Sequence, residues 1–242
     1  MINILIPMAG QSQFFPEAEY PYPKPLVEVC GKTIIEHVIN NFSDISEEKR
    51  FIFIVNSSDC KKYHIDNVLN LLTDEKCEII KIDGETKGAA CSALMAIEYI
   101  DNDSKLIIVN SDQVFDVNTN SLLDGFKECD AGVLVFDSIH PRWSYVSVGS
   151  ENNILETSEK RPISNMAIAG FYFFREGSSF VSSVKSMIRK DAHVNGSYFI
   201  APALNEMILK SKKLLAQRID NDLYHTFYAT NKIKEYERQR EC

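Results

Sequence analysis

Short apolar runs rich in β-branched residues alternate with longer amphipathic stretches over the first 136 residues. The apolar runs contain few polar residues, which is typical of strands covered on both faces of a sheet. They lie at residues 2–6, 51–55, 78–82, 106–109 and 132–136. The stretches between them carry apolar residues at helical spacing, at 33–42, 59–72 and 89–100. This alternation predicts an α/β fold with a mostly parallel central sheet flanked by helices.

The pattern changes after residue 137. Residues 145–148 and 167–174 resemble strands of a β-rich insert, and residues 178–188 and 198–209 resemble later helices. No repeat or low-complexity linker separates the two halves. We therefore expect a single domain over residues 1–242, with a nucleotide-binding half (1–136) and an acceptor-side half (137–242).

The chain is acidic, with 26 Lys and Arg residues against 34 Asp and Glu residues and a net charge of −8. Such a balance opposes binding to a nucleic-acid backbone, so we expect no nucleic-acid partner. Phosphorylated small molecules need only a few local cations. The apolar runs are too short to span a bilayer, and the first residues do not form a signal peptide. We expect a cytoplasmic protein without a membrane segment.

Six cysteines are scattered along the chain without a C-x-x-C pair or a histidine at zinc-ligand spacing. A structural zinc site is therefore not expected. The pattern favours reduced, mostly buried thiols.

A small turn and a proline-flanked lysine follow the first apolar run. Met8, Ala9 and Gly10 end that run, and a turn of small residues lets backbone N–H groups approach a nucleotide base or a phosphate. Lys24 lies between two prolines, which restrict its backbone, so its ammonium group can be directed at a phosphate at low entropic cost. Since ligands bind beyond the carboxyl ends of strands in open α/β sheets, both features mark a candidate site.

Asp112 follows the strand predicted at residues 106–109, in the run Val-Asn-Ser-Asp-Gln. A carboxylate at this place can hold Mg²⁺, which usually binds one or two protein carboxylates together with substrate phosphates. The alternative is an Asx turn or a helix N-cap, for which Asp is common.

The run Gly-Glu-Thr-Lys-Gly-Ala-Ala, residues 84–90, forms a predicted loop that leads into a helix near Gly88. Small residues such as Gly88 and Ala89 allow a flat base to lie against the backbone, with Glu85 in the same loop. Close packing of the helix on the sheet explains the small residues equally well.

A second charged run contains Lys160 and Arg161, with Pro162 fixing the turn that follows. Lys160 could hold an acceptor phosphate, and a solvated charge cluster is the alternative. Trp143, the only tryptophan, is interpreted as an anchor of the insert's core, and the role of Arg142 is left open.

Taken in order, these segments resemble the nucleotidyltransferase superfamily that activates sugar phosphates and related phosphorylated small molecules. The family pattern is roughly Met-Ala-Gly-x-Gly-Ser-Arg-Phe, a short insert and Pro-Lys-Pro-Leu, and its start and end match residues 8–10 and 23–26. The resemblance implies transfer of a nucleotidyl group from an NTP to a phosphorylated acceptor, with release of pyrophosphate. Asp112 is then the principal magnesium ligand and Lys24 the catalytic cation.

The resemblance also implies roles for the remaining motif residues. Met8, Ala9, Gly10, Glu85, Gly88 and Ala89 would form the nucleotide site. Lys160, Gly170, Asn195 and Glu206 would form the acceptor site.

Within the family, the blocks Gly-Glu-Thr-x-Gly-Ala-Ala-Cys and Asn-Ser-Asp-Gln are similar to bacterial surface-polysaccharide members. They favour CTP as donor and a sugar 1-phosphate, phosphocholine or phosphoglutamine as acceptor. Phosphoglutamine is included because the chain resembles, in size and loop sequence, the cytidylyltransferase of capsular phosphoramidate synthesis.

Two departures leave other interpretations open. Ser12 and Phe14 replace the family's second loop glycine and its arginine, and no aspartate near the C-terminus matches a second metal ligand. One alternative is a non-catalytic nucleotide-binding paralogue. Another is a nucleotide-sugar-dependent glycosyltransferase, although such enzymes usually carry an Asp-x-Asp motif where this chain has Ser111-Asp112-Gln113.

Overall fold

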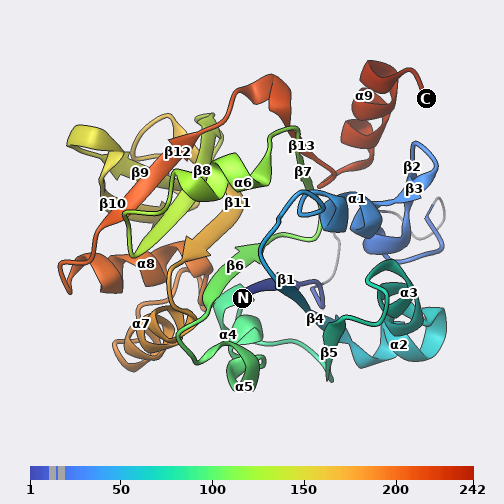
Figure 1. Ribbon diagram of the computed structural model, residues 1–242, viewed down its shortest axis with the longest axis horizontal. Helices are drawn as coiled ribbons and strands as arrows, with labels where there is room; N and C mark the ends of the chain where they lie inside the picture. Colours follow the sequence, from blue (N-terminus) through green and yellow to red (C-terminus); the bar gives the residue numbers. More distant parts are fainter. Residues whose placement is uncertain (11–14, 16–19) are drawn as a thin grey trace.

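The computed structural model describes residues 1–10, 15 and 20–242, and these residues form a mixed α/β fold. Its centre is a nine-stranded sheet in which seven strands follow the order β10-β9-β11-β6-β1-β4-β5 (Figure 1). The other two are β8, which pairs with β11, and β12, which pairs with β8. The strands are β1 (Ile2–Pro7), β4 (Lys49–Asn56), β5 (Cys77–Ile82), β6 (Lys105–Val109), β8 (Ala131–Asp137), β9 (Ser144–Val148), β10 (Ile154–Glu159), β11 (Met166–Phe174) and β12 (Leu214–Arg218). The α/β fold expected from the sequence is confirmed.

The sheet has a parallel part and an antiparallel part. Strands β6, β1, β4 and β5 run parallel, with Ile4 paired to Phe51 on one side and to Ile107 on the other. Strand β11 runs antiparallel to β6, β8 and β9, and it joins the two halves of the chain into one continuous sheet. The antiparallel part corresponds to the expected β-rich insert.

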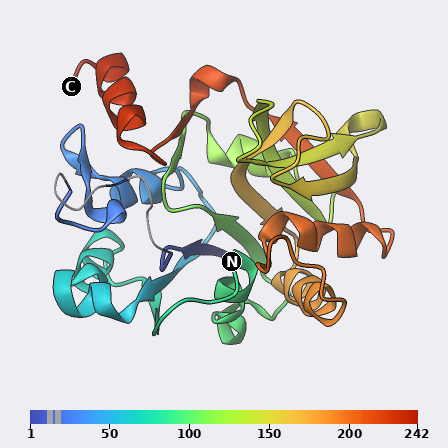
Figure 2. The same ribbon diagram turned by 180° about the vertical axis from the view of Figure 1, so that it is seen from behind.

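Helices cover both faces of the sheet, as Figures 1 and 2 show from opposite sides. One face carries α4 (Ala89–Leu94), α5 (Ile97–Ile100), α7 (Gly177–Arg189) and α8 (Ile200–Ile208), and the other carries α1 (Ile34–Asn40), α2 (Ser57–Tyr63), α3 (Ile65–Leu72) and α6 (Thr119–Asp124). In β1, Leu5 belongs to the apolar core on the side of α4, α7 and α8, whereas Ile4 and Ile6 belong to the core on the side of α1, α2 and α3. Successive side chains of a strand point to opposite faces, so β1 is buried on both faces. Its one polar side chain, Asn3, is also buried and bonds to Arg50 and to the Tyr99 carbonyl oxygen.

Two stretches predicted as single helices are interrupted. Residues 59–72 form α2 and α3, because His64 adopts φ +54° and ends the first helix. Residues 89–100 form α4 and α5, separated at Met95 and Ala96.

Three kinds of small element lie outside the main sheet: a hairpin, a two-stranded ribbon and the C-terminal helix. A short hairpin pairs β2 (Glu28–Val29) with β3 (Lys32–Thr33), and a two-stranded ribbon pairs β7 (Gln113–Phe115) with β13 (Tyr224–Thr226). Helix α9 (Thr230–Arg240) lies beside the β2–β3 hairpin in both ribbon views. A third apolar cluster, which includes Val29, Phe227 and Tyr236, connects these elements.

A disulfide joins Cys30 to Cys242, with the two Cα atoms 5.3 Å apart. The expectation that all six cysteines are reduced is therefore wrong for this pair. The chain brings them together because α9 packs beside the β2–β3 hairpin, which contains Cys30 at its turn. Cys60, Cys77, Cys91 and Cys129 are free thiols.

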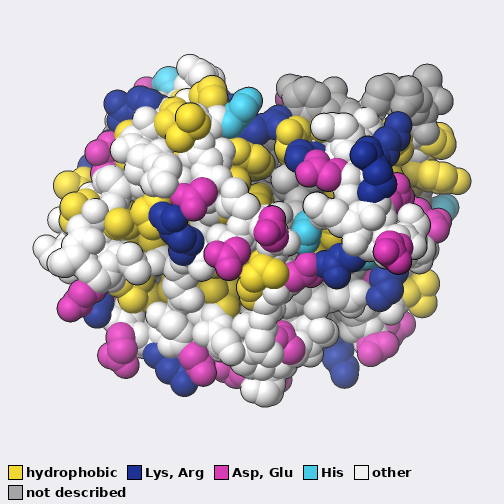
Figure 3. All heavy atoms as spheres, turned by 90° about the horizontal axis from the view of Figure 1, so that it is seen from above, with side chains coloured by type: hydrophobic (Ala, Val, Ile, Leu, Met, Phe, Trp, Pro, Cys, Tyr) yellow, Lys and Arg dark blue, Asp and Glu magenta, His cyan; other side chains and the backbone are white. Residues whose placement is uncertain are grey.

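Within the described ranges, no helix has the length and apolar character needed to cross a bilayer. On the face in Figure 3, basic and acidic side chains are interspersed, without a patch of one sign.

Candidate active site

A cleft opens where the parallel strands β1 and β6 end. Because the two strands are direct neighbours in the sheet, the segments that follow them lie side by side. A cavity of about 400 Å³ and two smaller ones open along this side of the molecule, and the one at the ends of β1 and β6 measures about 250 Å³. It is lined by Pro7, Met8, Gly10, Lys24, Pro25, Asn110, Ser111 and Asp112.

Lys24 and Asp112 form an ion pair in this cavity. The distance from Lys24 Nζ to Asp112 Oδ2 is 2.6 Å, although the residues are 88 positions apart in the chain. Pro23 and Pro25 flank Lys24 at the start of a 3₁₀ turn, Lys24–Leu26, which directs its side chain into the cavity. The side chains of Lys24 and Asp112 are 17% and 13% exposed. The structure therefore brings together the two residues predicted to meet the triphosphate.

The cavity fits a magnesium ion held jointly by protein and substrate. Asp112 supplies one carboxylate, and Asn110 and Ser111 beside it carry neutral oxygen atoms. Among the described residues, no group of three or more His, Cys, Asp or Glu side chains could form a protein-only metal cage. Mg²⁺ commonly uses one or two carboxylates with substrate phosphates, so Asp112 is the residue that would hold it.

Close packing explains why the loop before α4 contains a glycine. Gly88 has φ +103°, and a Cβ there would lie 2.5 Å from the Tyr198 carbonyl oxygen. The backbone N–H of Ala90 donates to that same oxygen at 3.0 Å. Close packing, the alternative considered for this loop, therefore accounts for Gly88, whereas Ala89 lines the cleft and Glu85 is exposed. Their part in nucleotide binding stays a prediction.

A second cavity of about 180 Å³ adjoins the first at Asn110, which lines both. It is lined by Ala89, Asn110, Arg142, Trp143, Ser144, Glu159, Ile168, Gly170, Tyr172, Phe199 and Ile200. Most of these residues come from the half of the chain expected to bind the acceptor.

Gly170 forms part of this cavity and cannot be replaced without rearrangement. Its φ is +68°, and a Cβ would overlap the side chains of Gln113 and Asn110. The glycine thus makes room for two polar side chains at the bottom of the cleft.

Glu159 is a candidate residue that the sequence reasoning missed. It lies at the end of β10 and lines the second cavity, and its carboxylate accepts a hydrogen bond from Ser144 Oγ. Burial raises the pKa of Glu159, and the bond from Ser144 and the charge of Lys160 offset part of that rise. The signal was present, because Glu159 precedes Lys160 in the same motif.

Lys160 and Asn195 lie together, outside the second cavity. Both line a separate surface hollow with Arg161, and both have positive φ, +54° and +51°. Lys160 is exposed, and its Nζ is 4.8 Å from the centre of the Phe199 ring. Phe199 lines the second cavity, so Lys160 is adjacent to the cleft.

Glu206 does not reach the cleft. Its carboxylate is buried between α7 and α8 and pairs with Lys190 at 2.8 Å. This ion pair satisfies the buried charge, so the geometry gives no support to an acceptor role. Ser12 and Phe14, the two departures from the family pattern, lie outside the described residues.

Comparison with known proteins agrees with this geometry. A family model described as nucleotidyl transferase matches residues 20–222. The chain therefore belongs to the nucleotidyl transferase family.

Three curated relatives show the range of similar proteins. The chain is 24% identical over 244 residues to the bifunctional protein GlmU of Methanocaldococcus jannaschii, covering 92% of this chain and 56% of GlmU. It is 25% identical over 205 residues to the UTP–glucose-1-phosphate uridylyltransferase AglF of Haloferax volcanii, covering 82% and 80%. It is 31% identical over 101 residues to 2-C-methyl-D-erythritol 4-phosphate cytidylyltransferase of Wigglesworthia glossinidia brevipalpis, covering 41% of each. The chain thus spans about half the length of GlmU.

Solved structures share the fold over the whole chain. A nucleoside-diphosphate-sugar pyrophosphorylase from Vibrio cholerae RC9 has a TM-score of 0.84 and 24% identity, covering 98% of this chain and 100% of that one. A UDP-glucose pyrophosphorylase complexed with UDP-glucose has a TM-score of 0.75 and 16% identity, covering 100% and 99%. At such identities the likeness establishes the fold.

Proposed function

We propose that this protein transfers a nucleotidyl group from an NTP to a phosphorylated small-molecule acceptor and releases pyrophosphate. The observation that carries the proposal is the Lys24–Asp112 pair at the ends of β1 and β6, in a chain that belongs to this family. An ammonium and a carboxylate in one cavity provide a cation for phosphate and a ligand for a divalent metal.

The reaction needs positioning and charge neutralisation more than acid–base chemistry. An oxygen of the acceptor phosphate forms a bond to the α-phosphorus, and the bond from that phosphorus to the β-phosphate bridging oxygen breaks. The electron pair leaves with pyrophosphate. Lys24 would neutralise the α-phosphate, Asp112 would hold Mg²⁺, and Lys160 would draw the acceptor phosphate towards the cleft. A bound Mg²⁺ supplies charge neutralisation for the phosphates.

We favour CTP as donor and a surface-polysaccharide precursor as acceptor, with phosphoglutamine, a sugar 1-phosphate and phosphocholine as candidates. Ala89, a small residue at the start of α4, lies in the cleft wall and supports a compact base site. The similarity to a cytidylyltransferase covers 101 residues and supports the same preference, while AglF, named for UTP, represents the competing donor.

The direct test is pyrophosphate release with Mg²⁺, each of the four NTPs and a panel of these acceptors. We expect release with one NTP and one acceptor class. Asp112→Asn and Lys24→Ala should each lower the rate by at least about 100-fold, because each removes a charge beside the reacting phosphates.

Asp66 and Lys81 provide a matched control. They form an ion pair of the same length, 2.6 Å, between α3 and β5. Asp66→Asn and Lys81→Ala should keep the wild-type rate. Saturable NTP binding without pyrophosphate release from any acceptor would identify a binding protein instead, and near-normal turnover of Asp112→Asn would exclude the assigned role.

A further inference from the structure

The proposed function gives Lys24 and Asp112 other partners than those they have in the structure. In the transfer reaction Lys24 would contact a phosphate and Asp112 would hold Mg²⁺, whereas here Lys24 Nζ lies 2.6 Å from Asp112 Oδ2. At that distance the ammonium group uses the carboxylate oxygen that a metal ion would also use. Lys24 and a metal ion therefore compete for the same carboxylate.

The charge of the cavity opposes a metal ion that enters alone. Of the described residues that line it, only Lys24 and Asp112 are charged, and the others are apolar or neutral. The carboxylate is thus already balanced, and a free divalent cation would meet an ammonium group of its own sign. Both side chains of the pair are largely buried, so water and salt screen this repulsion little.

The backbones of both residues are fixed, so the pair can open by rotation of the lysine side chain alone. The N–H of Val27 donates to the Lys24 carbonyl oxygen at 3.1 Å, and the next residue, Pro25, is buried. The N–H of Phe227 donates to the Asp112 carbonyl oxygen at 2.8 Å. Lysine carries its charge on a flexible four-carbon stem, so its ammonium group can leave the carboxylate without a backbone movement.

A triphosphate supplies the negative charge that makes this opening favourable. Its oxygen atoms can accept the ammonium group of Lys24 and also fill coordination positions of Mg²⁺ that the protein leaves free. With a free metal ion, Lys24 would leave Asp112 without gaining a new anionic partner. The exchange is therefore favourable for the metal and the triphosphate together and unfavourable for the metal alone.

We propose that Lys24 occupies the cation position at Asp112 in the free protein and yields it only to a metal ion that arrives with the triphosphate. The protein thus excludes free divalent cations and admits metal and nucleotide as one complex. This inference rests on the proposed function for the nature of the nucleotide, and it adds the order in which the components bind. Lys24 replaces the metal before the reaction and contacts phosphate during it.

Metal binding without nucleotide tests the inference directly. Free Mn²⁺ gives an EPR signal that is lost when the ion binds, so a titration with Mn²⁺ reports affinity without turnover. We expect weak binding by wild type and at least about tenfold tighter binding by Lys24→Met, because methionine frees the carboxylate and has a side chain of similar length. Lys24→Arg, which keeps the cation, should bind as weakly as wild type.

The double variant Lys24→Met/Asp112→Asn locates the new metal site. It should lose the whole gain, because an amide replaces the carboxylate that the lysine had covered. Equal Mn²⁺ affinities of wild type and Lys24→Met would overturn the inference, and so would a gain that persists in the double variant.

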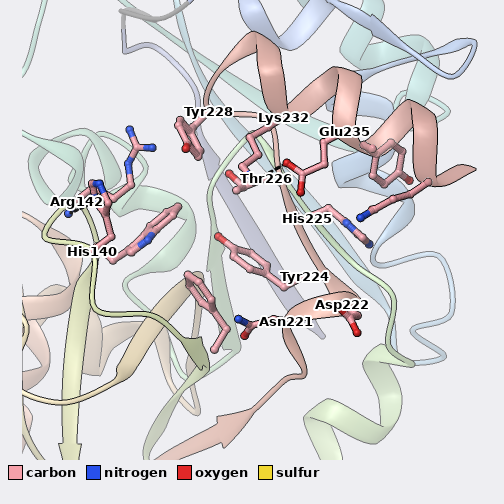
Figure 4. Close-up of a pocket in the computed structure, with 14 residues that line it drawn as sticks. His140, Arg142, Asn221, Asp222, Tyr224, His225, Thr226, Tyr228, Lys232 and Glu235 are labelled. Atoms are coloured by element: carbon pink, nitrogen blue, oxygen red, sulfur yellow. Dashed lines mark hydrogen bonds and ion pairs between the residues drawn. The ribbon is translucent and has the colours of Figure 1, made fainter.

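Lys232→Met is the matched control. Lys232 and Glu235 also form an ion pair of 2.6 Å, and both line the cavity of about 400 Å³. Figure 4 shows the two side chains on α9 at the wall of that cavity. The Glu235 side chain is 50% exposed, against 13% for Asp112, so water already screens its charge. This variant should bind Mn²⁺ as weakly as wild type, and a gain equal to that of Lys24→Met would contradict the inference.

Melting temperatures provide a second readout. Lys24→Met leaves the largely buried charge of Asp112 without its partner, so it should melt at a lower temperature than wild type in EDTA. Millimolar Mg²⁺ should restore part of this loss, because an ion that binds the folded chain stabilises it, and should leave wild type unchanged. A rise for wild type with Mg²⁺ alone that is absent from Asp112→Asn would overturn the inference, even if Lys24→Met does not fold.

Calorimetric titration with the α,β-methylene analogues of the four NTPs tests the arrival of metal and nucleotide together. We expect wild type to bind one analogue at least about tenfold more tightly with Mg²⁺ than in EDTA. Equal affinities would overturn the inference, and binding of none of the analogues would overturn both it and the proposed function.

The inference and the proposed function can fail separately. Analogue binding and the Mn²⁺ gain of Lys24→Met, without pyrophosphate release from any acceptor, would overturn only the proposed function. Pyrophosphate release by wild type, without the Mn²⁺ gain, would overturn only the inference.

Discussion

Individual side chains in the cleft owe their positions to strand ends and to their immediate neighbours. Lys24 is fixed by two prolines and by its pair with Asp112, and Glu159 by the end of β10 and by Ser144. Burial raises the pKa of Glu159 above its ordinary value. A raised pKa has a consequence for stability.

We expect Glu159→Gln to be more stable than wild type at neutral and alkaline pH. A carboxyl group whose pKa is raised by folding favours the folded state below its unfolded pKa, and this contribution is lost as pH rises through the folded pKa. Glutamine can still accept the bond from Ser144 and carries no charge. The gain in melting temperature should therefore be largest near pH 8 and shrink as the pH falls towards 4.5, the ordinary value for Glu.

Glu156→Gln serves as the control for this measurement. Glu156 is on the same strand, β10, but it is exposed and pairs with Arg161. Its replacement should give no gain that grows with pH. A gain for Glu159→Gln that is equal at all pH values would show that ionisation of the buried carboxyl group is not its cause.

At the scale of elements, the C-terminal helix is the least expected feature. Helix α9 carries charged residues along most of its length, yet Ile233 and Tyr236 are buried against Val29 and Phe227. The Cys30–Cys242 disulfide joins its end to the β2–β3 hairpin across 212 residues of sequence. Cross-links that close long loops restrict the unfolded chain strongly.

A thiol titration tests this connection. Denatured, unreduced protein should contain four reactive thiols, and reduction should raise the number to six. In the native protein Cys129 should resist alkylation at pH 8, because burial raises its pKa to about 11. Cys242→Ser should show a free Cys30 thiol. Six thiols before reduction would contradict the disulfide.

The sequence predicted the elements whose pattern is local and repetitive. The five strands of the first half and the residues Lys24 and Asp112 followed from apolar runs and short motifs. Burial on both faces was wrong for β5, which lies at the edge of the sheet with only Ile82 buried. The β7–β13 ribbon did not follow from such patterns, because each strand is three residues long and their pairing brings together distant parts of the chain. Glu206 was assigned to the acceptor site from its motif, because the sequence does not show its ion pair with Lys190, which directly follows α7. Pairing and ion pairs of this kind depend on the completed fold.

At the scale of the whole molecule, three adjoining cavities lie beside one edge of a continuous sheet. Parallel strands β1 and β6 provide the Lys24–Asp112 cavity, and β11, antiparallel to β6, carries the acceptor-side half to it. Asn110 lines both the first and the second cavity, and Arg142 both the second and the third. The proposed function predicts that a triphosphate and a phosphorylated acceptor occupy these adjoining cavities, as an in-line transfer requires.

The most direct measurement of the central claim is phosphorus NMR of the products formed with Mg²⁺, CTP and the active acceptor. Cleavage at the α-phosphorus predicts pyrophosphate and a nucleoside diphosphate ester of the acceptor in equal amounts, both missing with Asp112→Asn. Formation of CDP, with phosphate transferred or released, would place the reaction at the γ-phosphorus and contradict the account.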